Sequence, residues 1–134
     1  MILLDTNVVV RIVTGEGLIG RAARDLLNDS DELWCSAMVQ WEIATLARKG
    51  KLRFEMPVDV WLEQAATLLD YGEMPVTGGI ARDAGNLPSP IHGDPGDRIM
   101  IATARAMTCP LMTTDRKILD YAAEGHLKAI DARR

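Results

Sequence analysis

HGDPGDRIMIATA, residues 92–104, is the stretch that decides how this chain folds. It opens with turn residues and two carboxylates, Asp94 and Asp97, and is then almost wholly apolar. The apolar side chains fall on nearly every side of a helix, and only Arg98 and Arg105, seven residues apart, indicate a side that faces water. We therefore expect a central, buried helix with two acids at its start.

The segments around this helix alternate between short apolar runs, which predict strands, and longer runs with helical spacing. We expect strands at residues 2–4, 33–35, 73–76, 111–113 and 127–130. We expect helices at residues 6–13, 18–27, 37–49 after a Ser36 cap, 58–70, 80–85 and 116–124, with a loop over 86–96 before the central helix, which ends near Met107. Short apolar strands without alternation are typical of a parallel sheet covered on both faces. The order predicts one α/β domain over residues 1–134, with three layers and a short, mainly parallel central sheet.

The composition limits the classes of protein that the chain can be. With 134 residues and 48% hydrophobic side chains, it is long enough to build a core without disulfides. A net charge of −4 and only three Trp, two Tyr and one Phe argue against broad charge-driven binding of nucleic acid or a stacking platform. Cys35 and Cys109 show no metal-like spacing, so we expect reduced thiols in a cytoplasmic protein. The apolar start is interrupted by Asp5, which indicates a strand and no membrane segment.

Two acids directly follow predicted strands. Asp5 follows residues 2–4, and Asp115 follows residues 111–113 after a single threonine. Ligands of parallel α/β sheets bind beyond the carboxyl ends of the strands, so both acids should lie on one rim. The alternative is that each aspartate only caps the next helix.

Glu42 and Asp97 are harder to explain as surface or capping residues alone. Glu42 borders the stripe that we expect to be buried on its helix, and no basic residue lies three or four positions away. That stripe comprises Val39, Ile43, Leu46, Ala47 and Gly50. Asp94 suits the N-cap of the central helix, with Pro95 in its first position and Asp97 where an acid completes a capping box. Capping explains Asp94 well, whereas Asp97 is also placed for chemistry.

The four acids Asp5, Glu42, Asp97 and Asp115 come from separate elements of one small domain. If they converge, their charges repel one another unless a cation is present. Oxygen ligands without His or Cys suit Mg²⁺ or Mn²⁺ rather than Zn²⁺. One or two such ions can activate a water and stabilise the leaving oxygen of a phosphodiester. The pattern predicts a divalent-metal nuclease site.

Four short motifs resemble those of the PIN domain family, most closely its VapC-type toxin ribonucleases. They are LLDTN at 3–7, WEIA at 41–44, HGDPGDRIMIATA at 92–104 and TTDRKI at 113–118. Each is weak alone, but the four occur in order and the resemblance spans residues 1–130. It implies a PIN-like fold and a Mg²⁺- or Mn²⁺-dependent endoribonuclease, with an RNA substrate, an antitoxin partner and a homodimer.

The resemblance also implies roles for individual residues. The acids Asp5, Asp97 and Asp115 would contact metal directly, and Glu42 would act directly or through water. Supporting roles fall to Asp94, Thr6, Asn7 and Thr113, of which the last three have helix capping as an equal alternative. Two positions depart from the family pattern, namely Arg11 and Gly96, where relatives carry apolar or bulky residues. These two departures affect what the resemblance implies about substrate preference and groove shape, and not what it implies about the four acids.

An RNA substrate needs positive charge near the acids. The densest basic run is Arg48-Lys49-Gly50-Lys51-Leu52-Arg53, six residues beyond Glu42, although a basic helix end that answers the helix dipole is the alternative. Arg11, Arg98 and Arg116 are further candidates for phosphate contacts. We expect His92 to form loop hydrogen bonds and not to act as the base.

Two other functions remain open from the sequence. One is a phosphatase that uses Asp5 as a covalent nucleophile, although such enzymes usually carry a second Asp where this chain has Asn7. The other is a non-catalytic PIN-fold module that only binds a protein partner. All four acids are present, which favours the nuclease.

Overall fold

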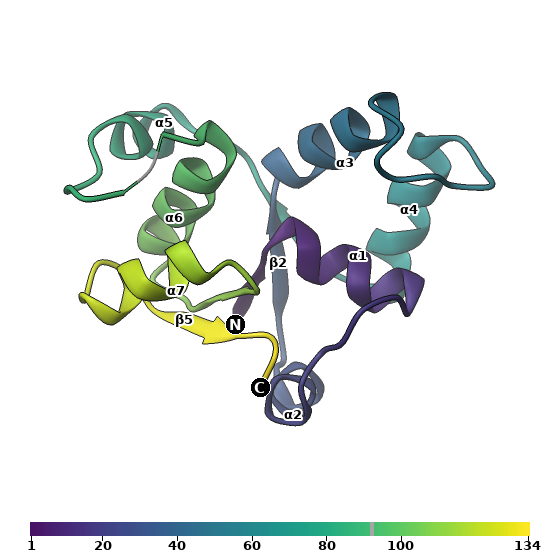
Figure 1. Cartoon of the computed structure of the whole chain (residues 1–134), viewed down its shortest axis with the longest axis horizontal. Coiled ribbons are helices and arrows are strands. Elements are labelled where there is room, and N and C mark those ends of the chain that lie inside the picture. The colour runs from purple at the N-terminus through teal and green to yellow at the C-terminus, as the bar shows by residue number, and fades with distance from the viewer. Residues whose placement is uncertain (92) are drawn as a thin grey trace.

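A computed structural model describes residues 1–91 and 93–134, and helices and strands alternate along them (Figure 1). The strands are β1 (Ile2–Leu4), β2 (Leu33–Ser36), β3 (Gly72–Met74), β4 (Leu111–Thr113) and β5 (Ala129–Asp131). The helices are α1 (Thr6–Thr14), α2 (Arg21–Asp29), α3 (Met38–Arg48), α4 (Val58–Leu69), α5 (Gly78–Gly85), α6 (Pro95–Met107) and α7 (Arg116–Ala123).

The strands form one parallel sheet in the order β3-β2-β1-β4-β5. The chain moves from β1 outward to β2 and β3, and then returns to β4 and moves outward the other way to β5. Because crossover connections in parallel sheets are right-handed, the two directions place their helices on opposite faces. Figure 1 shows α1, α3 and α4 on one side and α5, α6 and α7 on the other. The predicted three-layer α/β architecture with a short parallel sheet is confirmed.

The two central strands create the position at which the site forms. β1 and β4 are neighbours, with Leu3 opposite Leu111 and Leu4 opposite Met112. The chain leaves them in opposite directions, so their carboxyl ends are the topological switch point at which open α/β sheets bind ligands. Asp5 directly follows β1, and its backbone N–H donates to the Met112 carbonyl of β4 (3.0 Å). The acid is therefore fixed at the switch point by the sheet itself.

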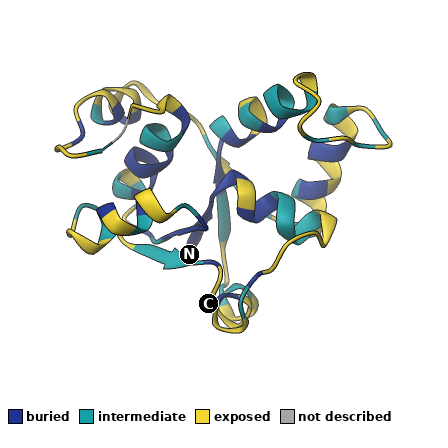
Figure 2. Ribbon diagram, viewed as in Figure 1, coloured by how far each residue is buried: buried dark blue, intermediate teal, exposed yellow. Residues whose placement is uncertain are grey.

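Helix α6 is the buried helix that the opening stretch predicts. Its residues 100–104 are all buried, and Met100, Ile101 and Ala102 expose none of their surface. Figure 2 shows this burial on α6 and on the central strands, with the exposed residues gathered on the outer helix faces and loops. Packing on this scale fixes the direction in which the start of α6 points.

Several element boundaries differ from the sequence-based expectation. The second helix begins at Arg21 and not at residue 18, because Leu18 is 77% exposed and lies in the turn before it. Strand β3 covers 72–74, where we expected 73–76, and β5 covers 129–131, where we expected 127–130. Helix α5 begins at Gly78, two residues early, because Thr77 caps it through the Ile80 N–H. Helix α6 takes in Pro95 and Gly96 from the expected loop.

The buried stripe expected on α3 is only half correct. Val39 and Ile43 are buried, but Leu46 and Ala47 are half-buried. Gly50 is exposed with φ of +72°, so it ends the helix in a left-handed conformation and does not join the core.

Two further expectations concern the cysteines and the membrane. Cys35 and Cys109 are both free thiols inside the core. Over residues 1–91 and 93–134, no helix is long and apolar enough to cross a membrane.

Candidate active site

Asp5 is the most deeply buried of the four acids, with 5% of its surface exposed. One carboxylate oxygen accepts the Thr6 N–H (2.8 Å), which caps α1, and the other accepts the Thr113 hydroxyl (2.6 Å). Burial raises the pKa of Asp5, and these two hydrogen bonds offset part of the effect. Asp5 therefore caps α1 through one carboxylate oxygen and still lies on the rim, next to Thr113, through the other. The two roles that the sequence offered as alternatives are compatible.

Thr113 connects Asp5 to Asp115 across the ends of β1 and β4. Its hydroxyl donates to Asp5 Oδ2 and accepts the Asp115 N–H (3.0 Å), and the residue is fully buried. The Asp115 carboxylate in turn accepts the Lys117 N–H (2.8 Å) and caps α7. One threonine hydroxyl thus sets both the orientation of one acid and the start of the segment that carries the other.

Glu42 reaches the same rim from the middle of α3. Its Oε1 accepts the hydroxyl of Thr6, which is buried at the start of α1 (2.9 Å). Thr6 therefore serves two acids, since its N–H binds Asp5 and its hydroxyl binds Glu42. The hydrogen bond to an acid that the sequence suggested for Thr6 and Thr113 is present in both cases, while Asn7 is exposed on α1.

The start of α6 brings the remaining acids to this rim. Asp94 caps the helix, because its Oδ1 accepts the N–H groups of Gly96 (2.9 Å) and Asp97 (3.3 Å). Pro95 occupies the first turn, as the capping interpretation predicts. Asp97 follows in the same turn, where the helix dipole favours negative charge. The helix-starting role that the sequence predicts for Asp94 is confirmed by these hydrogen bonds, and the metal-binding role of Asp97 stays a prediction.

The carboxyl groups of Asp97 and Glu42 both have raised pKa values. Burial is the largest cause that raises the pKa of Asp97 to about 7, and the charges of Asp94, Asp5, Asp115 and Glu42 add to it. Burial likewise raises the pKa of Glu42 to about 7, with smaller contributions from Asp5 and Asp94 and an opposing one from the Thr6 hydroxyl. Carboxyl groups with such neighbours are expected at functional sites.

The donor set fits a hard divalent cation. Every side chain that converges here offers oxygen, which is the ligand atom that Mg²⁺ and Mn²⁺ prefer. A bound cation would also remove the mutual repulsion that helps to raise the pKa of Asp97. Within the described part of the chain, no three His, Cys, Asp or Glu side chains lie close enough together to hold a metal ion as they stand. The Asp5 and Glu42 carboxylates are held in place by the Thr6 N–H and by the hydroxyls of Thr6 and Thr113.

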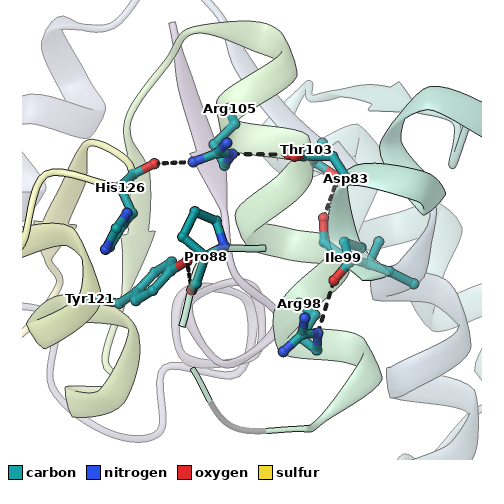
Figure 3. A network of polar contacts seen from close by, with 9 residues as sticks. Asp83, Pro88, Arg98, Ile99, Thr103, Arg105, Tyr121 and His126 are labelled. Atoms are coloured by element: carbon teal, nitrogen blue, oxygen red, sulfur yellow. Dashed lines mark hydrogen bonds and ion pairs between the residues drawn. The ribbon is translucent and has the colours of Figure 1, made fainter. Parts of the chain in front are cut away.

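Two of the candidate RNA-binding arginines have structural contacts. The Arg98 guanidinium donates to the carbonyls of Ala84 (2.8 Å) and Gly85 (3.4 Å) at the end of α5. Figure 3 shows Arg98 within a group of polar contacts that also includes Arg105 and Asp83. The Arg11 guanidinium donates to the Leu18 carbonyl (2.8 Å) at the far end of α1. Both arginines therefore bind backbone carbonyls of their own chain.

The other basic candidates lie on exposed segments. Arg48, Lys49, Lys51 and Arg53 are exposed at the end of α3 and in the turn after it, and Arg116 is exposed at the start of α7, next to Asp115. The expectation for His92 lies outside the described residues.

Sequence reasoning missed the part that Gly96 plays in the site. We recognised it only as a departure from the family pattern. In the structure it is buried, and a Cβ placed on it would lie 3.1 Å from Glu42 Oε2. Residues 42 and 96 are far apart in sequence, so only the contact between α3 and α6 reveals this proximity.

Comparison with known proteins places this arrangement in a family. The family model for the PIN domain matches residues 2–124. Ribonuclease VapC22 of Mycobacterium tuberculosis is 32% identical over 120 residues, which cover 90% of this chain and 91% of that protein. The chain belongs to the PIN domain family.

Solved structures agree with the fold. A structure of FitAB bound to an IR36 DNA fragment matches with a TM-score of 0.70 and 19% identity, over 100% of this chain and 96% of the other. A toxin–antitoxin complex from Klebsiella pneumoniae matches with a TM-score of 0.65 and 19% identity, over 97% and 96% of the two chains. At this level of identity, the similarity supports the fold alone.

The Thr113 hydroxyl provides a first test. Thr113→Val removes the donor to Asp5 and the acceptor for the Asp115 N–H, so we expect a loss of about 1–3 kcal/mol in the free energy of unfolding, measured in denaturant. The matched control is Thr103→Val, which changes an equally buried threonine whose hydroxyl only bonds the Ile99 carbonyl one turn earlier (2.6 Å). Equal stability losses in the two variants would contradict the role given to Thr113.

The raised pKa values provide a second test. Because the pKa of Asp97 is raised from 3.8 to about 7 in the folded protein, its ionisation destabilises the metal-free fold. This penalty is fully present above pH 7 and declines steadily as the pH falls from 7 towards the ordinary value of 3.8. Asp97→Asn should therefore stabilise the protein in EDTA at pH 8 by about 1–2 kcal/mol and flatten the pH dependence. The control Asp25→Asn changes an exposed residue on α2 and should neither stabilise the protein at pH 8 nor flatten its pH dependence. Melting curves between pH 5 and 8 measure this, and a less stable Asp97→Asn variant at pH 8 would contradict it.

Proposed function

We propose that this chain is a Mg²⁺- or Mn²⁺-dependent endoribonuclease and the toxin of a toxin–antitoxin pair. The observation that carries the proposal is the set of carboxylates that Thr6, Thr113 and the start of α6 bring to the β1–β4 switch point, where burial is the main cause that raises the pKa of Asp97 and of Glu42 to about 7. A relative that covers nine tenths of the chain is named a ribonuclease, which supports RNA as the substrate.

In this proposal Asp5, Asp97 and Asp115 hold the metal directly, and Glu42 does so directly or through water. When bound, one or two divalent ions would supply an activated water and stabilise the leaving oxygen of the cleaved phosphodiester. The chain's own part is to orient the ligands. Thr113 and the Thr6 N–H hold Asp5, while the Thr6 hydroxyl holds Glu42. Asp94 fixes the first turn of α6, and with it the position of Asp97.

RNA contacts fall to the basic residues that remain exposed. These are Arg116 beside Asp115 and the cluster Arg48, Lys49, Lys51 and Arg53 beyond α3. Since the chain carries a net charge of −4, such local groups must compensate the repulsion between the acids and the phosphates. We assign Arg11 and Arg98 lesser roles, because their guanidinium groups already bind backbone carbonyls.

An antitoxin partner and a homodimer complete the proposal, in a protein that works in the cytoplasm. The solved structures that share this fold include toxin–antitoxin complexes. The chain also exposes large apolar side chains beside a cavity of about 500 Å³ between α1, α2 and α4, among them Leu68, which is 65% exposed. Apolar surface of this kind is typical of protein partners.

A phosphatase that attacks through Asp5 fits this geometry less well. Both oxygens of that carboxylate accept hydrogen bonds from buried groups, and only 5% of the residue is exposed. A covalent nucleophile needs an accessible oxygen. Trapping a phosphorylated Asp5 would nonetheless favour the phosphatase.

The proposed activity is tested with the purified chain and fluorescently labelled RNA. We expect cleavage in Mg²⁺ or Mn²⁺, no cleavage in EDTA, and losses of at least 100-fold in Asp97→Asn and Glu42→Gln, since each removes a charge that would hold or orient the metal. Asp25→Asn serves as the control and should cleave normally. Full activity in EDTA, or an Asp97→Asn variant as active as the parent, would refute a metal nuclease. Absence of both RNA cleavage and Mn²⁺ binding, measured by calorimetry, would favour the binding module.

A further inference from the structure

Gly96 lies between two acids at the start of α6. It is buried, and it is the second residue of that helix. A Cβ placed on it would lie 3.1 Å from Glu42 Oε2, 3.2 Å from Glu42 Cδ and 3.3 Å from Asp94 Oδ1. Distances between 3.0 and 3.4 Å are tighter than nine in ten real Cβ contacts, so a side chain here would require the Glu42 carboxylate and Asp94 Oδ1 to shift by a few tenths of an ångström.

The backbone itself does not require glycine at this position. Gly96 belongs to the α-helix that runs from Pro95 to Met107, where other residues are preferred, and glycine weakens a helix relative to alanine. In contrast, Gly15 and Gly50 have φ of +71° and +72° and end their helices in the left-handed region. The absence of a side chain at residue 96 is therefore explained by the space it leaves and not by its dihedral angles.

Glu42 uses that space. Its Oε1 is held by the hydroxyl of Thr6, a buried residue of α1, and its other oxygen and Cδ lie against the backbone of Gly96. The carboxylate is thus confined between the start of α1 and the start of α6. A methyl group at residue 96 would push it by a few tenths of an ångström or break its bond to Thr6.

We propose that Gly96 is a positioning residue, whose bare Cα lets the Glu42 carboxylate lie against the first turn of α6 beside Asp94 and Asp97. The packing part of this proposal is independent of the activity, and its catalytic consequence rests on the proposed function. Displacements of a few tenths of an ångström matter at such a site, because metal–ligand distances are tolerated only within about 0.2 Å.

Thermal unfolding in EDTA tests the contact between residue 96 and Glu42, because the change in melting temperature caused by Gly96→Ala should differ in sign with and without the Glu42 carboxylate. In the parent background, Gly96→Ala should lower the melting temperature, because the methyl group meets Glu42. In a Glu42→Ala background, the same change should raise the melting temperature by up to roughly 2–4 °C, because the two closest contacts are gone and only the 3.3 Å contact with Asp94 Oδ1 opposes the helix-forming gain of alanine. In a Glu42→Gln background, which keeps the side-chain volume without the charge, Gly96→Ala should again lower the melting temperature. A role in helix stability alone would give the same sign in all three backgrounds.

Gly79→Ala is the matched control. Gly79 is also the second residue of its helix, α5, and its Cβ would meet only the capping Thr77 Oγ1, at 3.9 Å. This variant should be at least as stable as the parent, and it should cleave RNA within twofold of the parental rate. Gly96→Ala should cleave at least tenfold more slowly.

The outcomes separate the packing from the activity. If Gly96→Ala raises the melting temperature of the parent as Gly79→Ala does, or cleaves RNA at the parental rate, the proposal is overturned. If the parent itself cleaves no RNA, the proposed function fails, and the sign change in melting still decides the packing. If Gly96→Ala does not fold, a folded Gly96→Ala/Glu42→Ala variant that melts above Glu42→Ala supports the proposal, and an unfolded one overturns it.

Discussion

The burial of carboxylates at the carboxyl end of the central sheet is the constraint on which the arrangement of this rim depends. Burial and the neighbouring acids together raise the pKa of Asp97 to about 7, and burial is again the main cause for Glu42. Burying ionised carboxylates lowers the free energy of unfolding. Hydrogen bonds to the carboxylates, and the positive end of the dipole at each helix N-terminus, reduce this cost. Asp5, Asp94 and Asp115 each cap a helix, so the groups that make the site are also the groups that begin α1, α6 and α7.

Two threonines connect these helix starts into one unit. Thr6 serves Asp5 and Glu42, and Thr113 serves Asp5 and Asp115. Both threonines are buried, so their hydroxyls have little access to competing water. Asp5 therefore lies at the centre of the network, in keeping with its place between the two middle strands.

The sequence was sufficient to predict the architecture, and the site role of the four acids stays a prediction. Apolar runs followed by acids revealed β1 and β4, and the apolar character of 99–107 revealed α6. The ends of elements were predicted less well, because Leu18 is apolar yet 77% exposed and Thr77 extends α5 backward by capping it. Arg98 looked like a water-facing residue, since no sequence pattern reveals that its partners are carbonyls at the end of α5. The contact between Gly96 and Glu42 depends on the packing of α3 against α6, which a linear sequence does not display.

The central claim is that these carboxylates form one divalent-cation site, and a crystal structure of the chain grown with Mn²⁺ tests it most directly. Anomalous scattering identifies the ion without reference to activity. We expect at least one Mn²⁺ with oxygen ligands at about 2.0–2.3 Å from among Asp5, Asp97 and Asp115, with Glu42 bound directly or through water. Full occupancy of a site elsewhere on the chain, with these four acids unchanged and without metal, would contradict it.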